Sequence, residues 1–93
     1  MKYKITPYTY QRADQLNVVV KPSEKRFKKI DVFDKNGNYI VSVGDSRYLD
    51  FPYYIKNFGI KEAIKRRRLY KMRHKKDKDV KGTAGYYADK LLW

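Results

Sequence analysis

Apolar and polar residues alternate most clearly in two neighbouring segments, 27–34 and 39–43. Between them lies Lys35-Asn36-Gly37-Asn38, in which Asn-Gly supplies the positive φ angles of a tight hairpin turn. Because side chains alternate with period two along a strand, Ile30 and Val32 are expected to share one face. Apolar residues also occupy the opposite face of that strand and one face of the next, at Phe27, Phe33, Tyr39, Val41 and Val43. The pattern predicts a β-hairpin, and the apolar groups on both of its faces suggest that each face is covered.

A short helix is predicted directly after the hairpin. Asp50 before Phe51-Pro52 is typical of an N-cap followed by proline in the first helical turn, so the helix should run from Phe51 to Asn57 and end at Gly59. Its side chains are strongly aromatic. Such a cluster usually forms hydrophobic core, and a platform for stacking nucleobases is the alternative.

A long basic helix is predicted from Ile60 onward, because the chain is rich in helix-forming residues and has no proline or glycine before Gly82. One stripe at helical spacing is expected to meet the hairpin; it comprises Ile60, Ala63, Arg67, Tyr70 and His74, with Ile64 beside it. The stripe is only half apolar. Either Arg67 and His74 pack along their side-chain bodies with their polar ends paired, or a partner buries part of the helix.

The last helix is predicted from Ala84 to Leu92, after a hinge-like segment at 76–82 and a capping residue, Thr83. Its apolar face leads to Trp93, the last residue of the sequence. This tryptophan either fills the core of its own domain or anchors the chain in a pocket of a neighbouring subunit, where buried tryptophans often dominate binding.

Residues 1–25 contain two prolines, scattered tyrosines and a single β-rich segment, Leu16 to Lys21. They predict an extended arm with one candidate strand. This arm either docks on neighbours, with Tyr8 and Tyr10 as anchors, or packs on its own domain as an edge strand with frayed flanks.

These elements predict an α+β fold in one small domain. A β-hairpin or three-stranded antiparallel sheet is packed by the long basic helix and the short C-terminal helix, with an extended arm over residues 1–25 and a compact domain over 26–93. A chain of 93 residues buries only about 60–65% of its unfolded surface, so a partner can contribute to its stability. The 42% content of hydrophobic residues argues against disorder.

The sequence is strongly basic, and most of its positive charge lies in one segment. The formal net charge is +13, and residues 60–81 hold eleven positive side chains against Glu62, Asp77 and Asp79, a net of +8. This basic run is a solvated helix surface, a nucleic-acid contact that neutralises phosphates, or a contact with an acidic protein face. Arg66-Arg67-Arg68 also matches a nuclear-import signal, at low specificity. The residues expected to meet a partner or nucleic acid are Arg66, Arg68, Lys71, Arg73, Lys75 and Lys76.

Nothing in the sequence supports catalysis. Each of the ten carboxylates has a local explanation as a cap, a turn residue or a charge-balancing group, and residues 82–85 lack the glycine spacing and lysine of a nucleotide-binding loop. His74 has cationic neighbours on both sides, which favours a structural histidine over a general base. There is no cysteine, which removes thiolate metal sites and fits a reducing compartment. We therefore predict no enzyme activity, cofactor, metal or small-molecule substrate.

No membrane span is expected either. The longest apolar run, Val18-Val19-Val20, is far shorter than the roughly 20 residues that a span requires, and the first residues lead into no signal-peptide core. The protein is therefore not expected to be exported by a signal of its own.

Three segments in order resemble a known family: residues 42–51 (SVGDSRYLDF), 66–74 (RRRLYKMRH) and 83–93 (TAGYYADKLLW). The resemblance is to an uncharacterised family of small basic proteins of large double-stranded DNA viruses and tailed phages. The family pattern is a β-hairpin running into Gly-Asp-x-Arg-Tyr, an arginine-rich Tyr/His helix, and an Ala-Gly-aromatic segment that closes in Leu-Trp. The match covers Phe27 to Trp93.

The resemblance implies a viral origin and, by analogy, a structural virion protein. It would be a minor capsid or cement component that contacts larger capsid subunits and packaged DNA, located in the virion and, during assembly, in the host cytoplasm or nucleus. Trp93, Tyr8 and Tyr10 would then anchor it on neighbouring subunits. The alternative is a nucleic-acid-binding protein without sequence specificity, for genome condensation or regulation. A third hypothesis is an effector that inhibits a host enzyme.

Overall fold

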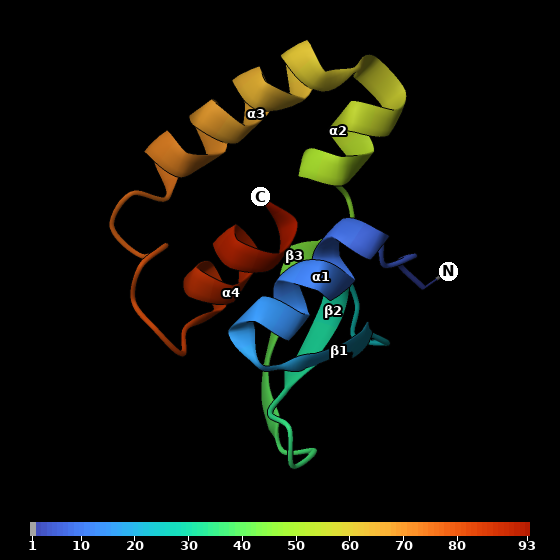
Figure 1. The fold of residues 1–93 in the computed structure, drawn as a ribbon, viewed down its shortest axis with the longest axis vertical. Helices are drawn as coiled ribbons and strands as arrows, with labels where there is room; N and C mark the ends of the chain where they lie inside the picture. Colours follow the sequence, from blue (N-terminus) through green and yellow to red (C-terminus); the bar gives the residue numbers. More distant parts are fainter. Residues whose placement is uncertain (1) are drawn as a thin grey trace.

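The computed structural model describes residues 2–93, which form a three-stranded antiparallel sheet and four helices (Figure 1). The strands are β1 (Val19–Pro22), β2 (Lys28–Phe33) and β3 (Tyr39–Asp45), in the order β1-β2-β3. The helices are α1 (Pro7–Leu16), α2 (Phe51–Phe58), α3 (Ile60–Arg73) and α4 (Ala84–Leu92). The predicted α+β class is confirmed, with the three-stranded sheet rather than the hairpin alone.

The predicted hairpin is formed by β2 and β3, with Ile30 opposite Val43 and Val32 opposite Val41. At the turn, Gly37 takes a φ of +88°, and the carboxylate of Asp34 accepts hydrogen bonds from two main-chain N–H groups. A shift of register after Val32 pairs Phe33 with Tyr39. This irregularity moves Tyr39 away from the face of Val41 and Val43 that simple alternation predicts, and its ring meets that of Phe33 edge to face.

The two faces of the hairpin differ in burial. Ile30, Val32 and Val43 belong to the core, whereas Phe27 is 41% exposed and Tyr39 is exposed. The expectation that both faces are covered is therefore met on the face of Ile30, Val32 and Val43, and only in part on the other, where Lys29 is buried.

The prediction of an extended arm over residues 1–25 is wrong for Pro7–Leu16, which form α1. Thr6 caps this helix by accepting a hydrogen bond from the N–H of Thr9, and proline occupies the first helical position, where its missing N–H costs nothing. Thr9 is buried and its hydroxyl donates to the main-chain oxygen of Leu91 at 2.9 Å, so α1 is fixed to α4. The strand predicted at 16–21 is present as β1, at the edge of the sheet.

The helices that cover the sheet are α4 and α1, not the basic helix. In Figure 1, α4 lies between α3 and the sheet, and α3 pairs with α2. Among residues 2–93, Ala63 is the single contribution of α3 to the buried core. The expectation that the long basic helix packs on the hairpin is therefore wrong. The helix also ends at Arg73, and turns occupy the chain from there to Thr83, which caps α4 as predicted.

Close approach of β3 and α4 depends on Gly44. This residue has a φ of +83°, and a Cβ atom there would lie 2.8 Å from Cδ1 of Leu92. Only glycine fits both the backbone conformation and the space. The contact brings the end of β3 close to the last turn of α4, next to the start of α2.

Candidate nucleic-acid interface

The inner face of α3 is held by Arg67, which contacts three other elements. Its guanidinium carbon lies 3.6 Å from the ring centroid of Phe51 in α2. Nε donates to the main-chain oxygen of Trp93 at 2.7 Å, and Nη2 donates to the hydroxyl of Tyr8 in α1 at 3.1 Å. The half-apolar stripe is expected either to pack with its polar ends paired or to be buried by a partner. The contacts of Arg67 support the first alternative.

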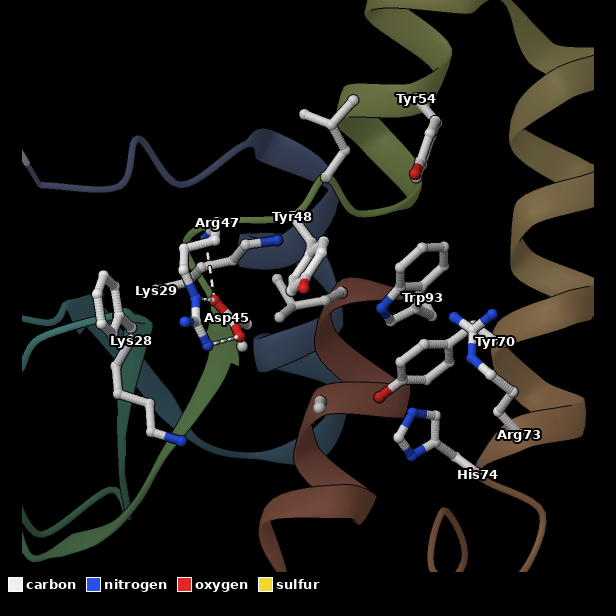
Figure 2. Close-up of a pocket in the computed structure, with 15 residues that line it drawn as sticks. Lys28, Lys29, Asp45, Arg47, Tyr48, Tyr54, Tyr70, Arg73, His74 and Trp93 are labelled. Atoms are coloured by element: carbon white, nitrogen blue, oxygen red, sulfur yellow. Dashed lines mark hydrogen bonds and ion pairs between the residues drawn. The ribbon is translucent and has the colours of Figure 1, made fainter.

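A stack of three rings continues this inner face. Tyr70 lies against Trp93 with centroids 4.5 Å apart and against His74 with centroids 4.2 Å apart (Figure 2). Trp93 is 8% exposed and belongs to the core of its own chain, the first of the two alternatives for this residue. Burial of the Tyr70 phenol, followed by the charge of Asp89, raises its pKa to about 12.

Tyr8 and Tyr10, the other two residues expected to anchor neighbours, differ in burial. Tyr8 is half-buried, packs against Phe51 at 5.6 Å between ring centroids, and accepts the hydrogen bond from Arg67. Tyr10 is 48% exposed on α1. Two of the three anchor residues, Trp93 and Tyr8, therefore serve the internal packing of the protein.

The residues predicted to bind a partner fall into two groups. Lys71 forms an ion pair at 2.9 Å with Asp89, which is fully buried, so its role is structural. Arg66 pairs with Glu62 at 2.7 Å on the surface. The remaining four are exposed and form no ion pair with any residue of 2–93; they are Arg68, Arg73, Lys75 and Lys76.

Two exposed lysines, Lys61 and Lys65, belong with this second group and are not among the residues predicted from the sequence. Lys61, Lys65 and Arg68 follow one another at spacings of four and three residues, which places them in one line along α3. We call these three residues the outer stripe. It lies on the side of the helix opposite the inner face of Ala63, Arg67 and Tyr70. The spacing is visible in the sequence and could have identified them.

Together the unpaired cations form what we call the basic surface. Within residues 2–93, seven exposed cations of the segment 60–81 have no ion pair: Lys61, Lys65, Arg68, Arg73, Lys75, Lys76 and Lys81. The first four are fixed on α3, and the others follow in the turns after it. Mutual repulsion among them is reduced when anionic groups bind nearby.

A cleft of about 570 Å³ lies between the end of the sheet and the C-terminal half of α3. Figure 2 shows its walls, with Lys28 and Arg47 on the strand side and Tyr70, Arg73 and His74 on the helix side. Five aromatic side chains line it, namely Phe27, Tyr48, Tyr54, Tyr70 and Trp93. The three segments that carry the family resemblance all contribute to these walls.

Two of the cations at the cleft are paired with carboxylates of the same chain. The guanidinium of Arg47 donates two hydrogen bonds to Asp45, at 3.0 and 2.8 Å, and together with the main-chain N–H of Arg47 these hold the pKa of that carboxyl at about 2 (Figure 2). Lys29 is 4% exposed and pairs with buried Asp50 at 2.9 Å. Lys28 and Arg73 are exposed and have no ion pair within residues 2–93, so they are the cations that can meet an anion here.

Asp50 connects the N-terminus, the sheet and α2. Its carboxylate caps α2 at the N–H of Tyr53, accepts from the ammonium of Lys29, and accepts from the hydroxyl of Tyr3 at 2.6 Å. Burial and the adjacent carboxylate raise the pKa of Tyr3 well above its ordinary value. These contacts fix the start of the α2–α3 pair on the sheet.

Residues 2–93 contain neither a helix suited to span a membrane nor a metal-binding cluster of side chains. No helix in this part of the chain has the length and apolar character to cross a bilayer. The same residues bring together no group of three or more His, Asp or Glu side chains suited to a metal ion.

Comparison of the chain with protein-family models, curated proteins and solved structures finds no match. The viral family resemblance therefore stays a prediction.

Proposed function

We propose that this protein binds nucleic acid without sequence specificity through its basic surface. The observation that carries the proposal is the set of seven exposed cations between residues 60 and 81 that have no ion pair among residues 2–93. Cations of this kind bind phosphates and release condensed counterions, which favours association regardless of base sequence.

The position of α3 supports the same proposal. Its inner face is tied to the fold by Arg67, Tyr70 and the buried Ala63, so the outer stripe is presented on a rigid helix. No other element lies over this side of α3 in Figure 1. A fixed row of cations loses less conformational entropy on binding a polyanion than a mobile tail does.

The test compares two variants with the same change of charge. Lys61→Gln/Lys65→Gln/Arg68→Gln removes the outer stripe, and Lys4→Gln/Lys21→Gln/Lys35→Gln removes three exposed lysines elsewhere. Fluorescence anisotropy with a labelled oligonucleotide at about 0.1 M salt should show a loss of roughly 10-fold for each phosphate contact removed in the first variant. The second variant should lose much less. Equal losses in both would mean that net charge, and not this surface, determines binding.

A second candidate function is docking on larger capsid subunits of a viral particle, as the family resemblance implies. The observation in its favour is a group of exposed apolar side chains around the junction of α2 and α3, namely Ile55, Phe58, Ile60 and Ile64. Exposed apolar groups in such proximity are typical of protein contacts. Mass spectrometry of purified particles tests this candidate, and absence of the protein from them would contradict it.

A further inference from the structure

We propose that the cleft beside α3 accepts one unpaired nucleobase with its sugar and phosphate, so that the protein prefers single strands to duplexes. This inference rests on the proposed function and assigns a ligand to a site next to the basic surface. The volume of about 570 Å³ falls within the range of roughly 300–1,000 Å³ that is usual for small-molecule sites.

Tyr48 is the side chain that most strongly indicates a nucleobase as the ligand. It is 69% exposed, and within residues 2–93 its ring has no aromatic or cationic partner. The other rings of the cleft are already in contact: Phe27 has the guanidinium of Arg47 4.3 Å from its centroid, and Tyr70 is stacked on both sides. A large apolar ring left free at the mouth of a cleft is available for stacking on a base.

Two polar groups in the cleft have no partner within residues 2–93. These are the indole N–H of Trp93 and the hydroxyl of Tyr70, which lie on the wall across from Tyr48 in Figure 2. The phenol of Tyr70 is protonated at neutral pH, as any tyrosine is, and burial raises its pKa further, to about 12, so its hydroxyl can donate. Both groups can therefore donate hydrogen bonds to the oxygens or ring nitrogens on the edge of a base.

The unpaired cations of the cleft suit the phosphate of the same nucleotide. Lys28 lies on the strand side and Arg73 on the helix side (Figure 2). Arg73 also belongs to the basic surface and is followed in the sequence by exposed Lys75 and Lys76, so a strand that leaves the cleft at this residue meets further cations that can neutralise its next phosphates. In a duplex the bases are paired and stacked, and none can enter the cleft without being extruded.

Aromatic character distinguishes this ligand from an acidic peptide. Only two exposed cations of the cleft are unpaired within residues 2–93, whereas five of its lining side chains are aromatic. Planar rings match that lining better than carboxylates do.

The experiment measures binding of labelled oligothymidylate of about 12 nucleotides and of a duplex of the same length, because single-strand sites span roughly 4–16 nucleotides. The variants are Tyr48→Ala and, as the matched control, Tyr10→Ala, which removes another exposed tyrosine remote from the cleft. We expect tighter binding of the single strand. Tyr48→Ala should weaken it by about 5- to 100-fold and leave the duplex within about 2-fold. Tyr10→Ala should change neither.

Intrinsic fluorescence gives a second measurement, since Trp93 is the single tryptophan of the chain. Oligothymidylate should change its emission, whereas inorganic polyphosphate, which carries phosphates without bases, should not. Equal affinity for the two nucleic acids with no effect of Tyr48→Ala would overturn the cleft assignment and leave the proposed function standing. Binding of neither nucleic acid at low salt would overturn both. Thymidine monophosphate that binds as tightly as the oligomer would assign the cleft to a free nucleotide and overturn the preference for strands.

Discussion

Arg67 and Arg68 are neighbours in the sequence, but the structure predicts opposite consequences for their replacement by alanine. Arg67→Ala should destabilise the fold, because its guanidinium contacts Phe51, the main-chain oxygen of Trp93 and the hydroxyl of Tyr8. Arg68→Ala should weaken nucleic-acid binding and leave stability nearly unchanged, because Arg68 is exposed and has no ion pair within residues 2–93.

The expected size of the Arg67 effect follows from its contacts. A cation over an aromatic ring contributes about 0.5–2 kcal/mol, depending on desolvation. Hydrogen bonds to a charged group contribute about 1.5–3 kcal/mol, and these terms overlap because one side chain makes them all. We expect the free energy of unfolding to fall by about 3 kcal/mol, which lowers Tm by roughly 12–24 °C for a domain of this size. Arg68→Ala at an exposed helical site should stay within about 0.5 kcal/mol of the wild type.

Thermal unfolding followed by circular dichroism measures the stability of both variants, and anisotropy at a temperature where both are folded measures binding. Arg67→Lys keeps the charge and loses the planar fork, so it should resemble Arg67→Ala in stability. Equal Tm values for Arg67→Ala and Arg68→Ala would refute the assignment of Arg67 to the packing of α3.

Two further variants test the interior. Asp50→Ala leaves the buried Lys29 ammonium, 4% exposed, without its carboxylate, so the free energy of unfolding measured in urea should fall by about 3–5 kcal/mol. Lys29→Met/Asp50→Ser removes both charges, keeps a capping hydroxyl and should recover most of that loss. A double variant as unstable as Asp50→Ala would contradict the assignment of Asp50 to a buried ion pair. Tyr70 has a folded-state pKa of about 12 against an ordinary value near 10, so its contribution to stability is complete below about pH 10 and is lost as the pH rises toward 12. Tyr70→Phe should reduce this alkaline loss, and an unchanged pH profile of stability would speak against burial of the phenol.

The hairpin and the caps of α2 and α4 could be predicted because their signals are local: Asn36-Gly37 at the turn, Asp50 and Thr83 at the helix starts. Helix α1 carries the same kind of start at Thr6-Pro7. It was missed because its buried positions are Thr9 and Ala13, which leave no apolar stripe at helical spacing.

The placement of α3 could not be predicted from its own residues. Its inner face packs through an arginine and stacked rings, which a pattern of apolar residues does not reveal, and the surface it meets comes from α2 and Trp93. The cleft likewise joins residues that lie far apart in the sequence, from Phe27 to Trp93. Only the tertiary structure brings Tyr48 and Trp93 to opposite walls of one site.

The dependence of binding on salt concentration measures how many phosphates the basic surface neutralises. For a single strand, each phosphate contact contributes about −0.7 to the slope of log K against log salt concentration, so roughly four to six contacts predict a slope of about −3 to −4. Lys61→Gln/Lys65→Gln/Arg68→Gln should reduce the magnitude of the slope by about 2. A shallow slope in the wild type, or the same slope in the variant, would contradict nucleic-acid binding through the basic surface.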